Sequence, residues 1–145
     1  SSERSGTLPT FQLIDLCFTS GKTAEEIKRM IVGNGGLVSY LNTNDGIEIR
    51  NRVDAGDEEA KFYMQAMAYQ IAKEIGALYF VAKGKIDAVI LTGGLANYTT
   101  LIDMIKDYIG MIVNMVVYPG EDEMNALVNG VLRIINNEEQ IKSYQ

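Results

Sequence analysis

The stretch Ile86-Asp87-Ala88-Val89-Ile90-Leu91-Thr92-Gly93-Gly94-Leu95-Ala96 determines the fold expected for this 145-residue chain. Its apolar run, rich in β-branched residues, is typical of a buried strand in a parallel sheet. The run stops at two glycines, and a helix is expected from Tyr98 to Ile109. Because open α/β sheets bind ligands at the carboxyl ends of their strands, the glycine turn is a candidate nucleotide site. The alternative is that the glycines serve only the turn, since the spacing is weaker than a full glycine-rich phosphate motif.

The segments after this turn predict a second buried strand, Ile112–Tyr118, and a last helix from Glu121 to Ile135. Two strands joined by a helix should pair in parallel, with a right-handed crossover. The last helix is expected to bury Met124, Leu127, Val128, Val131 and Ile135. Two strands are few for so many helices, so we expect further strands of the sheet upstream of Ser1.

The segments before this turn are expected to be mostly helical. The longest helix should begin at Asp57 and end near Gly84. Its apolar stripe consists of Ala60, Met64, Met67, Ile71, Ile75, Leu78 and Ala82. Shorter helices are expected over Thr10–Phe18, from the Thr23 and Glu26 capping box to Val32, and over Ile47–Val53, with an extended segment at Leu37–Leu41.

The composition excludes several classes of function. A net charge of −6 argues against a nucleic-acid partner. No apolar stretch approaches the ~18 residues of a membrane span. Histidine is absent, which excludes Ser-His and Cys-His catalysis and histidine metal sites in this chain. The one cysteine, Cys17, is expected to be a small buried hydrophobe in a cytoplasmic protein.

Ser20-Gly21-Lys22-Thr23 resembles the end of a phosphate-binding P-loop, but Leu16 stands where that motif needs glycine, so we reject it. Besides the glycine turn, three places could carry chemistry, and each has a plainer interpretation. Asp45 could bind a ribose hydroxyl or simply cap a helix. Asp122 and Glu123 could hold magnesium or complement a helix dipole. Arg4 could neutralise a transferring phosphoryl group or be solvated surface.

Six motifs follow one another along nearly the whole chain: Arg4-Ser5-Gly6, Asn44-Asp45, Gly56–Lys61, Met67–Ala77, Ile90–Ala96 and Tyr118–Glu123. Together they resemble the acetate/butyrate kinase family, and the Thr-Gly-Gly-Leu-Ala turn is closer to its butyrate branch. The resemblance implies an α/β fold of the ribonuclease-H-like (actin-like ATPase) class, with ATP bound between two such domains. Residues 1–145 would form the carboxyl-terminal part of the second domain, with the first sheet strands missing upstream.

The resemblance also implies a reaction: reversible phosphoryl transfer from ATP to butyrate, which gives butyryl phosphate and ADP with Mg2+. The phosphate loop and the catalytic aspartate would lie upstream of Ser1, so the chain alone is expected to be inactive. Association into a homo-oligomer is expected as well. The alternatives are a kinase for isobutyrate or another branched short-chain acid, and a non-catalytic nucleotide-binding module.

By position in the motifs, Arg4 would stabilise the transferring phosphoryl group and Asp45 would contact the ribose. Asp122, with Glu123 as second choice, would be associated with magnesium. Ile47 stands where acetate kinases carry an arginine, so stacking of that side chain on adenine is lost. The residues expected along the adenosine are Gly93, Gly94, Leu95, Ala96, Asn97 and Tyr98.

Overall fold

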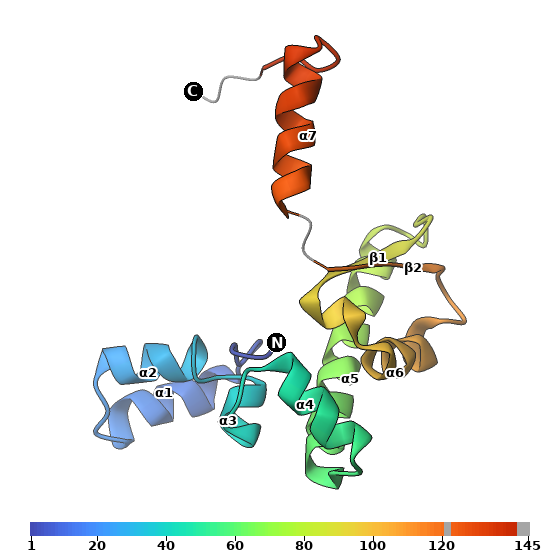
Figure 1. Ribbon diagram of the computed structural model, residues 1–145. Coiled ribbons are helices and arrows are strands. Elements are labelled where there is room, and N and C mark those ends of the chain that lie inside the picture. Colours follow the sequence, from blue (N-terminus) through green and yellow to red (C-terminus); the bar gives the residue numbers. More distant parts are fainter. Residues whose placement is uncertain (121–122, 142–145) are drawn as a thin grey trace.

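The computed structural model describes residues 1–120 and 123–141, and it combines a helical amino-terminal part with a parallel β-α-β unit (Figure 1). In chain order the elements are α1 (Thr10–Thr19), α2 (Ala24–Ile31), α3 (Leu37–Leu41), α4 (Gly46–Asp54), α5 (Glu58–Val81), β1 (Val89–Gly93), the 3-10 helix η1 (Gly94–Asn97), α6 (Thr99–Ile109), β2 (Met115–Pro119) and α7 (Glu123–Ile135). No helix in this part of the chain is long and apolar enough to cross a membrane.

The two strands pair in parallel, which confirms the prediction, and α6 connects them. Val89 pairs with Met115 and Gly93 with Pro119, so the carboxyl ends of the two strands lie level. Both strands begin three residues later than the sequence pattern indicated. β1 also continues beyond Leu91, because the ladder extends through the first glycine of the turn.

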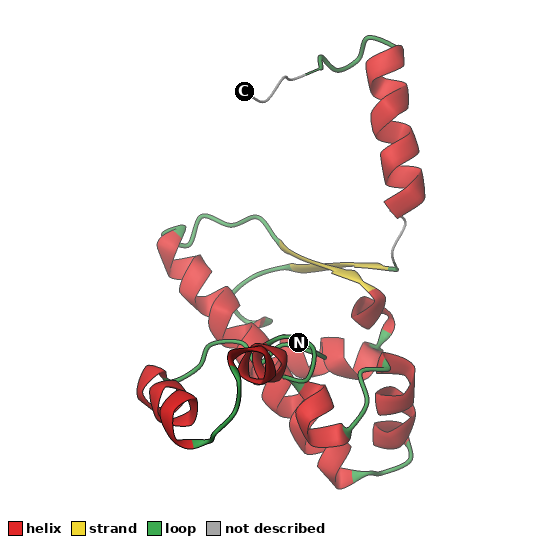
Figure 2. Ribbon diagram, turned by 90° about the vertical axis from the view of Figure 1, so that its left-hand side faces the viewer, coloured by secondary structure: helices red, strands yellow, loops and turns green. Residues whose placement is uncertain are grey.

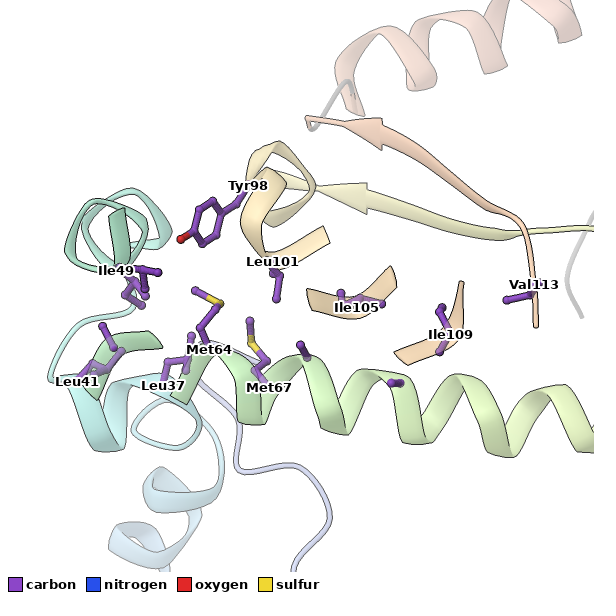
Figure 3. Close-up of a cluster of buried hydrophobic side chains, with 14 residues drawn as sticks. Leu37, Leu41, Ile49, Met64, Met67, Tyr98, Leu101, Ile105, Ile109 and Val113 are labelled. Atoms are coloured by element: carbon purple, nitrogen blue, oxygen red, sulfur yellow. The ribbon is translucent and has the colours of Figure 1, made fainter. Parts of the chain in front are cut away.

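The hydrophobic core lies where α5 contacts α6 and the small helices α3 and α4 (Figure 3). Ile49 of α4 and Met64 of α5 are completely buried, and Ile105 of α6 is 2% exposed. The apolar stripe predicted for α5 is buried through its first half. Leu78, near the carboxyl end of the helix, is 64% exposed. The stripe therefore forms core only along the turns that other elements cover.

The prediction of an extended segment at Leu37–Leu41 was wrong, because these residues form helix α3. Leu37 and Leu41 are four residues apart, so a helical turn places both side chains on one face. Both are buried in the core, at 3% and 5% exposure. Gly36 with φ +62° and Asn42 in the left-handed region flank this single turn.

The expected burial of α7 was also wrong, although the helix itself is present from Glu123. All five side chains that were expected to be buried are exposed: Met124, Leu127, Val128, Val131 and Ile135. The helix stands away from the body of the molecule (Figures 1 and 2). The apolar spacing thus gave the helix correctly, but no element of residues 1–120 covers its apolar face.

Cys17 is exposed, contrary to the expectation of a buried small hydrophobe. It lies on α1, which buries none of its residues. Phe11 and Phe18 on the same helix are more than 80% exposed. An apolar sequence around Cys17 was therefore a poor guide to burial, because α1 is covered only in part by its neighbours.

We predict that replacing Met64 with alanine lowers the free energy of unfolding by about 2–5 kcal/mol, because the substitution leaves a cavity in the core. Urea-induced unfolding of the two proteins would measure the difference. Met111→Ala is the matched control, since Met111 is 95% exposed and its removal opens no cavity. Equal losses for the two variants would contradict the placement of Met64 in the core.

Candidate functional site

Arg4 lies in an extended segment that pairs with the chain just after α2. Its backbone forms an isolated antiparallel bridge with Val32, and the Ser5 amide donates to the Ile31 carbonyl at 3.0 Å. The Arg4 side chain is exposed. Among the salt bridges of the described chain, none involves Arg4. The Arg4 backbone is thus fixed, while its guanidinium group is exposed and forms no salt bridge with the described residues. Such a group is suited to bind an anionic ligand.

Asp45 is the N-cap of α4, as the plainer interpretation expected. Its Oδ1 accepts hydrogen bonds from the amides of Ile47 at 2.8 Å and Glu48 at 3.3 Å. Its second oxygen, Oδ2, accepts no hydrogen bond from the residues that the structure describes. The side chain is exposed. One carboxylate can therefore cap the helix and still offer an acceptor to a ligand.

The glycine turn follows β1 directly. Gly93 has φ +89°, a conformation that glycine adopts without strain, and its carbonyl accepts from the Gly120 amide at 3.2 Å. A Cβ atom on Gly93 would meet nothing within 4 Å, so the space beside this residue is open. Gly94 and Asn97 are exposed, and the Asn97 amide donates to the Gly94 carbonyl at 3.1 Å. The turn thus presents backbone to the surface at the end of the sheet.

Ala96 and Tyr98 face the core, with 7% and 4% exposure. The Tyr98 hydroxyl lies 3.4 Å from Asp54 Oδ1, at the end of α4, and burial raises the pKa of the Tyr98 phenol above its ordinary value. Figure 3 shows this ring directed toward α4 rather than away from the body. In this conformation Tyr98 anchors the turn to α4, and Gly94 and Asn97 remain exposed, where a ligand could contact them.

The fold brings Asp45 and the glycine turn together from positions about fifty residues apart. Gly46, which follows Asp45, packs against η1: a Cβ atom there would lie 3.1 Å from Leu95 Cδ2. Asn44 also donates a side-chain hydrogen bond to Glu3, next to Arg4. The segments that contain Arg4, Asp45 and Leu95 are therefore linked by direct contacts. Sequence reasoning missed the bond between Glu3 and Asn44, because nothing in a local pattern connects residues so far apart.

The two acids predicted for magnesium cannot be assessed in the same way. Asp122 lies outside the described residues, and so does the side chain of Glu123, the first residue of α7. Elsewhere, in the side chains that the structure describes, no three acidic or cysteine residues gather as a metal site would require. The magnesium assignment therefore stays a prediction.

The pair Arg52–Asp57 joins α4 to α5 and so fixes the helix that carries Asp45. Arg52 Nε donates to Asp57 Oδ2 at 2.8 Å, and Arg52 Nη1 donates to the Leu41 carbonyl at 3.2 Å. Asp57 is also the N-cap of α5. The hydrogen bond from the Ala60 amide, and then the Arg52 guanidinium, hold the pKa of Asp57 below its ordinary value.

Comparison with known proteins gives the class to which this arrangement belongs. Residues 2–141 match the model of the acetokinase family. The chain belongs to the acetokinase family.

A curated relative from Caldanaerobacter subterraneus subsp. tengcongensis bears the name "Probable butyrate kinase 2". It is 49% identical over 144 residues, which are 99% of this chain and 41% of that protein. The chain thus spans about two fifths of the length of this relative.

Three solved structures share the fold. The acetate kinase of Porphyromonas gingivalis has a TM-score of 0.75 at 22% identity, over 90% of this chain and 39% of its own. The propionate kinase of Francisella tularensis subsp. tularensis has a TM-score of 0.73 at 21% identity, over 85% of this chain and 38% of its own. The acetate kinase of Entamoeba histolytica has a TM-score of 0.74 at 18% identity, over 89% of this chain and 41% of its own. These likenesses confirm the fold class expected for this chain.

We predict that acid weakens the wild-type protein more than an Asp57→Asn variant. Asp57 has a lowered pKa when folded, so its stabilising effect is complete above the unfolded value of about 3.9. The effect is lost as the pH falls from there through the folded pKa. Thermal unfolding between about pH 6 and about pH 2 would measure the stability difference between the two proteins.

Other carboxyl groups titrate in both proteins and cancel in this comparison. Asparagine keeps an oxygen for the helix cap, so the variant removes only the charge and the hydrogen bond from Arg52. A stability difference that stays constant with pH would contradict the role given to the Asp57 carboxylate.

Proposed function

We propose that this chain is the carboxyl-terminal, nucleotide-side part of a butyrate kinase, which transfers phosphoryl groups reversibly between ATP and butyrate. The observation that carries the proposal is the contact between the segment of Asp45 and the glycine turn after β1. An uncommitted carboxylate oxygen and an open backbone turn lie in adjoining segments at the end of a parallel sheet. These two groups suit a nucleoside, because the ribose hydroxyls can donate to the carboxylate and the nucleoside can approach the glycine backbone closely.

In the reaction, a carboxylate oxygen of the acid attacks the γ-phosphorus of ATP. The bond from that phosphorus to the oxygen shared with the β-phosphate breaks, and ADP leaves with the electron pair. The protein contributes mainly position and charge to such a transfer. Arg4 supplies a positive charge for the transferring group, since its guanidinium is exposed and forms no salt bridge with the described side chains.

The nucleoside would lie along Gly93, Gly94 and Asn97, with Leu95, Ala96 and Tyr98 supporting the turn from inside. Asp45 Oδ2 would accept from a ribose hydroxyl. Asp122 or Glu123 would hold magnesium, which neutralises phosphate charge when bound, and a carboxylate is the right donor for that ion. The residues that hold the phosphates and the acid would come from outside this chain, so residues 1–145 alone should be inactive. We place the full-length protein in the cytoplasm, as a homo-oligomer.

The full-length protein, given ATP and magnesium, should form acyl phosphate with butyrate faster than with acetate, propionate or isobutyrate, as trapped with hydroxylamine. Arg4→Ala should lower turnover by roughly 10²–10³-fold, because one positive charge is lost from the transferring group, and change the KM for ATP little.

Arg29→Ala is the matched control, since Arg29 is also an exposed arginine outside every salt bridge of the described chain. A preference for isobutyrate would identify the branched-acid kinase instead. Nucleotide binding without acyl phosphate from any acid would favour the non-catalytic module and sink the kinase proposal.

A second prediction separates the two roles of Asp45. Asp45→Asn keeps the oxygen that caps α4 but replaces Oδ2 with an amide donor, so the fold should survive. The KM for ATP should rise about 10-fold, which corresponds to one hydrogen bond to a charged group. With an ATP analogue lacking both ribose hydroxyls, wild type and variant should have the same KM. A rise that persists with the analogue would contradict the ribose contact.

A further inference from the structure

The turn Gly33–Gly36 lies directly against the backbone that carries Arg4. The amides of Gly33 and Gly35 both donate to the Glu3 carbonyl, at 2.9 and 3.1 Å. At the start of α3, the amides of Leu37 and Val38 donate to the carbonyls of Ser1 and Ser2 at 3.3 and 2.9 Å. Residues 1–5 are thus held by a row of main-chain hydrogen bonds from one side.

Two glycines of this turn, Gly35 and Gly36, leave no room for a side chain. A Cβ atom on Gly35 would lie 2.5 Å from the Ser5 nitrogen, 2.9 Å from the Met30 carbonyl oxygen and 3.0 Å from the Arg4 carbonyl carbon. All three are backbone atoms, which cannot rotate away as the end of a flexible side chain can. A Cβ atom on Gly36 would overlap the Ser1 carbonyl oxygen and lie 2.9 Å from that of Arg4. Any side chain here must displace residues 1–5.

The same segment is tied on its other side to the loop before α4. The carboxylate of Glu3 accepts a hydrogen bond from the side-chain amide of Asn44, which immediately precedes Asp45. Glu3 is therefore held at its backbone by the glycine turn and at its side chain by the Asp45 loop. Arg4, the next residue, has no salt bridge of its own in the described chain, so its position depends on these two attachments and on its backbone bridge with Val32.

We propose that Gly35 is a positioning residue: by admitting the backbone of residues 3–5, it sets where the Arg4 guanidinium lies relative to the Asp45 loop. This inference rests on the proposed function, in which Arg4 stabilises the transferring phosphoryl group. Phosphoryl transfer depends on positioning, so a displacement of about 1 Å at a charge-stabilising group is costly in rate. Gly35 itself touches no substrate and acts through Arg4.

The test is a double-mutant cycle in the full-length enzyme. Gly35→Ala should lower kcat at least 10-fold and leave the KM for ATP within about twofold of wild type. In the Arg4→Ala background, the same substitution should change kcat less than twofold, because the group it misplaces is already gone. Gly76→Ala is the matched control, since that glycine has open space around it and should have wild-type kcat.

A second pair of variants repeats the comparison at a residue with positive φ. Gly36, at φ +62°, meets backbone, whereas Gly21, at φ +67°, meets nothing within 4 Å. Both substitutions place alanine at a positive φ, but only Gly36→Ala also brings a Cβ atom against the backbone of residues 1–5, so only Gly36→Ala should lower kcat. If the glycine variants fail to fold, Glu3→Ala provides a milder displacement, and Glu3→Gln should restore kcat because its amide oxygen can still accept from Asn44.

Hydrogen exchange of the Ser5 amide gives a readout that needs no activity. This amide donates to the Ile31 carbonyl, so its exchange should accelerate in Gly35→Ala and stay unchanged in Gly76→Ala. Losses of kcat that multiply in the Gly35 and Arg4 double variant would overturn the proposal, as would unchanged Ser5 exchange. Wild-type turnover of Arg4→Ala would instead refute the role of Arg4 in the proposed function. If Ser5 exchange were still accelerated in Gly35→Ala, the failure would lie in that role and not in the placement of residues 3–5 by Gly35.

Discussion

Burial of the first half of α5 is the constraint on which the rest of this structure depends. Met64, with no exposed surface, lies where α5 meets the small helices and α6. Asp45 is the N-cap of α4, and only Tyr98 separates η1 from α6, so both candidate ligand segments lie at the ends of helices that share α5 as their support. The contact between Gly46 and Leu95 follows from that common support. The site is thus arranged by core packing, and its exposed residues make few contacts of their own.

Two polar links also hold this arrangement together. Arg52 bonds Asp57 at the start of α5 and the Leu41 carbonyl at the end of α3, so one side chain joins three helices. Tyr98 reaches Asp54 at the other end of α4. Since α4 is only nine residues long, contacts at both of its ends leave it little freedom to turn. These contacts of α4 therefore also fix the direction of the Asp45 carboxylate.

The sequence predicted those features that depend on local spacing, and it failed where burial depends on what covers a surface. The helix α5, the parallel pairing of β1 and β2, the capping box at Thr23 and the family itself were all predicted. Leu37–Leu41 was mistaken for extended chain, because a mostly apolar run of five residues fits a strand or one helical turn equally well. Cys17 and α7 were expected to be buried from their apolar neighbours alone. The contact of the Gly33–Gly36 turn with Glu3 and Arg4 was not predicted, since it joins segments about thirty residues apart.

One face of the two-stranded sheet carries exposed apolar side chains. Ile90 and Val116 are paired, as are Thr92 and Tyr118, so these four side chains lie on one face, opposite the face of Val89 and Leu91 that packs on the core. Ile90 is 59% exposed and Tyr118 is 63% exposed on that face. A parallel sheet is normally covered on both faces, and this chain spans about two fifths of its relative's length. In the proposed function, the described residues would provide one wall of a nucleotide site, with Arg4, Asp45 and the Gly93–Gly94 turn placed by their own core. Binding of the nucleoside would use contacts on that wall, whereas transfer of a phosphoryl group would need groups on both sides of it, so the position of Arg4 should matter more for rate than for binding.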